Sequence, residues 1–192
     1  MTSTATETGA VPSASWGVRD KILAAAMGLF YVEGINATGV DLVAEKAGVS
    51  KRTLYKYFPS KVNLVEQYLT SMFDMFLAMR EADTTGPREQ IMSLFTVPVA
   101  DGGLMRGCPF HNAAVEAAAV MPEVAEFVHR QKEAFATSIV DLCRDLGVDD
   151  ADLLGRRIAL VYEGAAALST SLDAVEPWAR ARAMVEMLLD LE

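Results

Sequence analysis

Residues 38–58 read TGVDLVAEKAGVSKRTLYKYF, two short runs with apolar residues at helical spacing on either side of a glycine. Thr38 offers a hydroxyl N-cap for a first short helix. Gly48 supplies the turn, Ser50 caps a second helix that ends near Phe58, and Ser60 caps the helix after it. Two short helices joined by a tight, glycine-containing turn form a helix-turn-helix. The spacing therefore predicts this motif.

The second helix would bury only Leu54 and Phe58. The rest of its surface would carry donors and aromatic hydroxyls without any acid, namely Lys51, Arg52, Thr53, Tyr55, Lys56 and Tyr57. A helix with such a face can enter the major groove of DNA and read base edges. Thr38 and Lys61 each stand at the start of a helix, where backbone N–H groups can hold a phosphate. The alternative is a face that is merely solvated, with Tyr57 packed against the first helix.

Apolar positions recur at helical spacing along the rest of the chain, and no stretch shows convincing period-two alternation. The expected helices cover about 16–33, 38–46, 51–58, 61–82, 87–99, 109–120, 122–146, 150–172 and 177–191. The sequence therefore predicts an all-α protein. It would have a disordered tail over 1–15, a three-helix helix-turn-helix domain over 16–62 and a larger helical domain over 63–192.

The composition is that of a globular protein without a disulfide framework. Of 192 residues, 52% are hydrophobic and 22% charged, which excludes a disordered chain. Cys108 and Cys143 allow at most one bridge, so a reducing cytoplasm is the expected compartment. Residues 1–15 hold no Lys, no Arg and no apolar core, so we expect no secretory signal. The longest apolar stretch, 22–32, is shorter than the roughly 20 residues that span a bilayer, so we expect no membrane contact.

The charge is unevenly distributed along the chain. The net charge is −9, which by itself argues against nucleic-acid binding. Between residues 19 and 61, however, seven basic and four acidic residues give +3, whereas residues 62–192 hold ten basic and twenty-one acidic residues. A small basic block followed by a larger acidic one indicates two separate tasks.

The acidic part carries most of the methionines and phenylalanines. An adaptable Met and aromatic lining suits an apolar ligand, although such residues at helical spacing are more often core. Gln131 is more informative, because an unpaired amide within an apolar stripe is costly; a ligand, a partner side chain or a water would explain it. The candidate ligand-binding residues are Met72, Phe76, Phe95, Cys108, His111, Phe127, Gln131, Phe135 and Tyr162.

Cys108 and His111 lie three residues apart beside a Gly-Pro break. A nucleophile pair, a metal site completed by His129 or Glu116, and a redox or electrophile sensor at Cys108 are all conceivable. Two His and two Cys at irregular spacing favour neither the nucleophile pair nor the metal site. We therefore expect no catalytic residue, no metal and no cofactor, and expect Cys108 to fill space or to touch the ligand.

The last two helices carry apolar residues suited to a two-fold interface. Two helices from each protomer would form a four-helix bundle. The alternative is that these residues cover their own domain. The candidate interface residues are Val161, Ala165, Leu168, Leu172, Met184, Val185 and Leu188.

The run AGVSKRTLYKYFPSK, residues 47–61, resembles the DNA-binding domain of the TetR/AcrR family of one-component transcriptional regulators. The resemblance is strong over about residues 17–65, and RGCPFHNAAVE, residues 106–116, is similar to a segment of some members. Tyr57 stands where many members have His, and Arg52 where many have a small residue. These departures leave the operator sequence unpredictable.

The resemblance implies a cytoplasmic homodimer that binds a near-palindromic double-stranded operator and a small, apolar effector in the larger domain. Thr38, Lys51, Tyr57 and Lys61 would contact phosphates; Arg52, Thr53, Tyr55 and Lys56 would contact bases. Effector binding would shift the helix that starts at Lys61 and release the DNA, which describes a repressor and not an enzyme. An activator of the same fold and a thiol sensor using Cys108 are the alternatives.

Overall fold

The computed structural model describes residues 16–81, 86–96, 106–117 and 120–191, and every regular element in these ranges is an α-helix. The helices are α1 (Val18–Val32), α2 (Val40–Lys46), α3 (Lys51–Tyr57), α4 (Lys61–Glu81), α5 (Pro87–Ser93), α6 (Pro109–Ala117), α7 (Pro122–Asp145), α8 (Ala151–Leu172) and α9 (Glu176–Asp190). The predicted all-α class is confirmed. Helix α5 stops short of its predicted end, and the tail over 1–15 lies outside the described residues.

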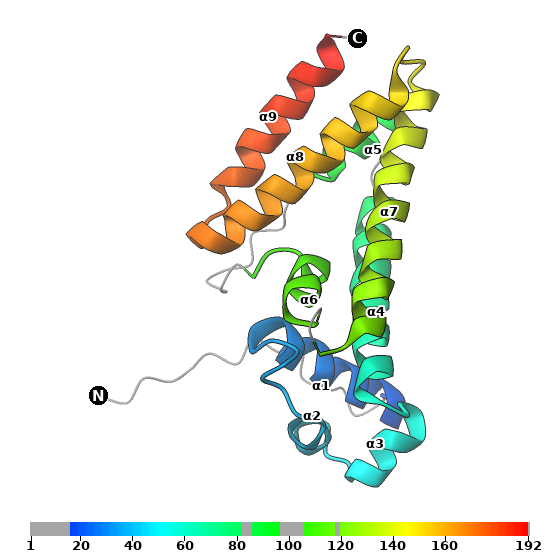
Figure 1. Cartoon of the computed structure of the whole chain (residues 1–192), viewed down its shortest axis with the longest axis vertical. Coiled ribbons are helices and arrows are strands. Elements are labelled where there is room, and N and C mark those ends of the chain that lie inside the picture. The colour runs from blue at the N-terminus through cyan, green and yellow to red at the C-terminus, as the bar shows by residue number, and fades with distance from the viewer. Residues whose placement is uncertain (1–15, 82–85, 97–105, 118–119, 192) are drawn as a thin grey trace, which may run out of the picture.

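Helices α1, α2 and α3 form the small unit at one end of the molecule (Figure 1). Gly48 has a φ of +69°, a left-handed conformation that glycine adopts readily, and it turns the chain between α2 and α3. Apolar side chains from all three helices and the residues beside them close this unit. They are Ile22, Ala26, Phe30, Ile35, Val43, Ala44, Leu54 and Phe58.

Two of the three predicted N-caps are present. Ser50 Oγ accepts a hydrogen bond from the backbone N–H of Thr53 at 3.1 Å, and Ser60 Oγ accepts one from Asn63 at 3.0 Å. The predicted cap at Thr38 is wrong, because α2 begins one residue later with Gly39 as its N-cap and without a side-chain cap.

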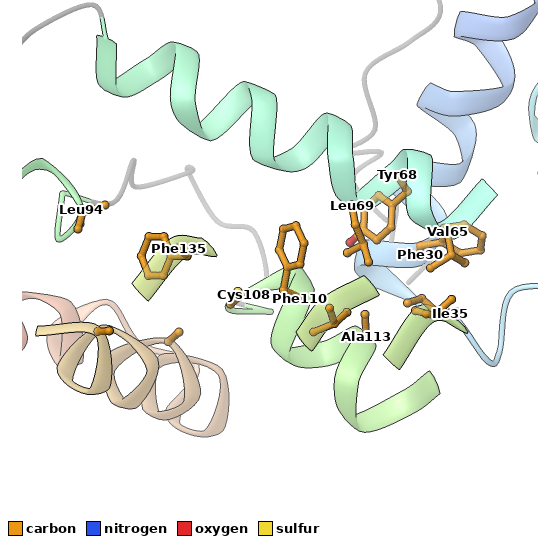
Figure 2. Packing of buried hydrophobic residues seen from close by; sticks show 14 of the residues in the cluster. Phe30, Ile35, Val65, Tyr68, Leu69, Leu94, Cys108, Phe110, Ala113 and Phe135 are labelled. Atoms are coloured by element: carbon orange, nitrogen blue, oxygen red, sulfur yellow. The ribbon is translucent and has the colours of Figure 1, made fainter. Parts of the chain in front are cut away.

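The larger unit is built around long helices. Helix α4 leaves the small unit and runs beside α7, while α8 and α9 form an antiparallel pair, and α6 lies between α1 and α8 (Figure 1). One continuous apolar cluster joins both units. Figure 2 shows the junction, where Phe30 and Ile35 meet Val65, Tyr68 and Leu69 of α4. The rings of Phe30 and Tyr68 lie edge to face, 5.6 Å apart.

Candidate nucleic-acid interface

Helix α3 is held by its inner face and presents its outer face to solvent. Leu54 and Phe58 are fully buried, as predicted, and the guanidinium of Arg19 covers the Phe58 ring at 5.2 Å. On the outer face Lys51, Arg52, Tyr55, Lys56 and Tyr57 are exposed, while Thr53 is half-buried with Oγ1 2.8 Å from Ser50 Oγ. The structure thus brings six of the predicted DNA-contacting residues together on one short helix.

Lys51 already has a partner. Its Nζ donates to Asp41 Oδ2 of α2 at 2.9 Å, and this hydrogen bond raises the pKa of Lys51. Both side chains are more than half exposed, so the ion pair is weakly held.

Thr38 and Lys61, the other two residues predicted to contact phosphates, are buried to different extents. Thr38 is fully buried, and its Oγ1 has no hydrogen-bond partner among the described residues. Its side chain therefore offers no surface to a phosphate in this conformation. Lys61 is half-buried at the first position of α4, and burial lowers its pKa, with the nearby Glu116 carboxylate acting in the opposite direction.

The larger unit gathers three of the predicted ligand-binding residues around the ring of a fourth, Tyr162. The centroid of the Tyr162 ring, on α8, lies 4.8 Å from that of Phe135 of α7, 6.0 Å from that of Phe95 and 6.4 Å from that of Phe76 of α4. Trp178 of α9 completes this aromatic cluster at 5.1 Å from Tyr162. Its ring is buried, and its Nε1 has no hydrogen-bond partner within the described part of the chain.

The other candidate ligand-binding residues are more scattered. Met72 and Phe127 are half-buried against the core, and Gln131 is half-buried on α7. Cys108 is buried, with its Sγ 3.4 Å from Nζ of Lys132, which also pairs with Glu163 of α8. His111 faces a different place, a groove of about 170 Å³ between α6 and α8. This groove is lined by Arg106, His111, Asn112, Val115, Glu116, Ala167, Thr170 and Ser171.

The predicted dimer residues divide by exposure. Leu168, Leu172 and Met184 are more than half exposed, and Val161 and Leu188 are half-buried. Ala165 and Val185 are buried in their own protomer, so they offer no side-chain surface to a second chain and are corrected to core positions. Leu160, Met187 and Leu191, which are not among the predicted interface residues, are exposed by 74%, 66% and 79%.

Two features are absent from the described residues. No group of three or more His, Cys, Asp or Glu side chains there is arranged to hold a metal ion. Within the same ranges, none of the helices combines the length and apolar character that crossing a membrane requires.

Residues 22–68, which hold α2, α3 and most of α1, match the family model of bacterial regulatory proteins, tetR family. Over 168 residues the chain is 30% identical to the HTH-type transcriptional activator FasR of Mycolicibacterium smegmatis, covering 83% of this chain and 71% of FasR. It is 34% identical over 87 residues to the HTH-type transcriptional repressor KstR2 of the same organism, which covers 44% of this chain and 42% of KstR2.

The resemblance extends to the whole fold. A crystal structure of a TetR-family transcriptional regulator from Streptomyces coelicolor superposes with a TM-score of 0.77 at 25% identity, over 90% of this chain and 94% of that one. The helix-turn-helix geometry, the matched domain and the relative aligned over most of both chains agree. The chain belongs to the TetR family of bacterial transcriptional regulators.

Proposed function

We propose that this regulator binds an inverted-repeat operator as a homodimer and is released from it by a small, largely apolar effector, as a repressor would be. The observation that carries the proposal is the outer face of α3, with basic and aromatic side chains exposed and no acid among them. Arg52 and Lys56 are the strongest candidates for base contacts, because both are exposed and neither has an ion-pair partner among the described residues.

The test is selection of bound sequences from a random duplex pool by the purified full-length protein at fixed, moderate salt. The expected product is an inverted repeat whose half-sites lie about 34–36 Å apart or a multiple of this. Affinity should fall steeply as salt rises. The Arg52→Ala, Lys56→Ala double variant should lose enrichment, whereas the control Arg130→Ala, at an exposed site on α7, should keep it. A folded wild-type protein that enriches no sequence would refute the proposal.

For the effector, the aromatic cluster around Tyr162 is the proposed contact region. The unpartnered indole N–H of Trp178 supports an effector that carries a hydrogen-bond acceptor, such as a carbonyl, on an apolar body. Compounds of this kind can be screened for release of the selected duplex. Trp178→Phe keeps an aromatic ring but removes the donor, so it should weaken release by acceptor-bearing compounds and leave operator affinity unchanged.

For the dimer, the exposed apolar surface of α8 and α9 supports pairing of these two helices with those of a second copy. The side chains proposed to meet the partner are Leu160, Val161, Leu168, Leu172, Met184, Met187 and Leu188. Two such helices from each protomer form a four-helix bundle, and the two-fold axis matches an inverted-repeat operator. Because its target is chromosomal DNA, we place the protein in the cytoplasm.

A second candidate function is thiol sensing at Cys108. The ammonium of Lys132 lies 3.4 Å from Sγ, and a cationic neighbour promotes attack by cysteine. Iodoacetamide would alkylate Sγ, with iodide leaving and the thiol proton passing to solvent. Release of the operator from the wild type but not from Cys108→Ser would support sensing, with the fully buried Cys143 as the internal control. Equal behaviour of the two proteins would refute it.

A further inference from the structure

Helix α6 is tied to the turn between α1 and α2 by a carboxylate clamp. Glu116, near the end of α6, accepts hydrogen bonds at Oε2 from the backbone N–H of Ile35 at 2.5 Å and of Asn36 at 3.2 Å. In return, Nδ2 of Asn36 donates to the backbone carbonyl of Glu116 at 2.5 Å. These three bonds join residues about eighty positions apart in the sequence.

The turn is shaped to receive this carboxylate. Gly34 precedes it with a φ of +96°, where side chains are strained. A Cβ at Gly34 would lie 2.9 Å from Oε2 and 3.1 Å from Oε1 of Glu116. Glycine therefore provides both the backbone conformation and the space that the carboxylate occupies. Ile35, which follows, is only 2% exposed and anchors the turn in the core (Figure 2).

The other end of α6 is tied to the last turn of α1. Arg106, just before α6, donates from Nε to the backbone carbonyl of Tyr31 at 3.1 Å. The hydroxyl of Tyr31 donates to the carbonyl of Gly107 at 3.3 Å, and burial raises the pKa of Tyr31, so the phenol stays a neutral donor. Helix α6 is thus fixed at both ends to the last turn of α1 and to the turn that follows it.

The turn is connected to the recognition helix α3 through α2. The turn leads directly into α2. Val43 and Ala44 of α2 are buried in the same apolar cluster as Leu54 of α3. On its other side, α6 faces α8 across the groove of about 170 Å³, to which Glu116 and Arg106 both contribute. A displacement of α6 relative to α8 would therefore pull on the turn through bonds to a charged acceptor, which are stronger than neutral ones.

We infer that Glu116 is a positioning residue for operator recognition. Its carboxylate passes the position of α6 to the α1–α2 turn and so sets the spacing of the two recognition helices in the dimer. The inference rests on the proposed DNA-binding function and adds a second connection to the one through α4.

The test uses the full-length protein and the duplex enriched by the wild type, together with duplexes that have one base pair inserted or deleted between the half-sites. Glu116→Ala should bind the enriched duplex about tenfold more weakly and should discriminate less against the altered spacings. Glu116→Gln, which retains an acceptor oxygen, should restore most of this discrimination. Glu126→Ala, at an exposed position on α7, is the matched control and should behave as the wild type.

The spacing preference separates positioning from a purely structural role, since a loss of folded protein lowers binding to all duplexes equally. An unchanged spacing preference in folded, dimeric Glu116→Ala would overturn the inference. If Glu116→Ala does not fold, Asn36→Ala carries the test, because Asn36 is exposed and its side chain contributes only one bond of the clamp. Failure of the wild type to enrich any sequence would overturn the proposed function. If the wild type does enrich an operator, the Glu116 variants test the positioning role alone.

Discussion

Replacing Gly155 by alanine should drive α7 and α8 apart. A Cβ at Gly155 would lie 2.6 Å from both Cα and Cγ2 of Val140 and 2.8 Å from its backbone nitrogen. Two of these three atoms belong to the backbone of α7, so no side-chain rotation relieves the clash. Restoring ordinary contact requires the two helices to separate by about 1 Å.

The expected cost follows from two opposing terms. Overpacking a well-filled core costs about 1–3 kcal/mol, and the rigid obstacle at Val140 places this site at the upper end. Alanine gains about 1 kcal/mol over glycine in a helix interior, which offsets part of that cost. The net loss of unfolding free energy should be about 2 kcal/mol. For a chain of this size it corresponds to a fall in Tm of roughly 4–8 °C.

The assay is thermal unfolding followed by circular dichroism at equal protomer concentration, since dimerisation makes Tm depend on concentration. Gly28→Ala in α1 is the matched control, because a Cβ there meets nothing within 4 Å. It should raise the unfolding free energy by up to about 1 kcal/mol through helix propensity alone. A Gly155→Ala protein as stable as the wild type, or more stable, would show that the close approach of α7 and α8 is not a constraint on the fold.

The remaining predictions concern DNA, pH and assembly. Arg52→Ala should cost roughly 1–3 kcal/mol in binding the selected duplex and relax its sequence preference if Arg52 grips a guanine, whereas a uniform loss across sequences would indicate a phosphate contact. Burial raises the pKa of Tyr68. The contribution of Tyr68 to the unfolding free energy should therefore be constant below pH 10, the ordinary tyrosine pKa being about 10, and should decrease as the pH rises above that value. Tyr68→Phe should reduce this decrease, measured by urea unfolding at pH 9 and pH 11. Leu172→Glu places a charge on the exposed apolar face of α8 and should convert the dimer to monomer in light scattering, and an intact dimer would remove that face from the proposed interface.

Helix positions could be predicted from the sequence because their signals are local. Apolar spacing, the hydroxyl caps at Ser50 and Ser60, and the glycine at position 48 all act within a few residues. The exposed face of α3 was also predictable, since a helix of two turns with two apolar anchors has only one way to face a core. The role of its residues in DNA binding stays a prediction.

The errors arose where tertiary packing decides the outcome. The burial of Thr38 depends on how the α1–α2 turn folds back on the core, which its own hydroxyl does not reveal. Ala165 and Val185 lie on helices with apolar residues on more than one face, so periodicity could not separate the core side from the partner side. Trp178 is not among the predicted site residues, although a tryptophan directly after a proline in the first turn of a helix is a usable signal.

Glu116 shows the same limit most clearly, because its carboxylate acts on backbone N–H groups about eighty residues away, a relation that no local pattern contains. Helix α4 continues directly from the helix-turn-helix, so any shift of α4 moves α3 through covalent geometry. Helix α6 has no such covalent route and acts on the same unit only through its hydrogen bonds and packing. If the proposed effector response uses both connections, α4 and α6 should move together, since a shift of one alone would strain the contacts between them. Loss of the clamp should therefore widen the range of half-site spacings bound, even when α4 and the recognition helix are unchanged.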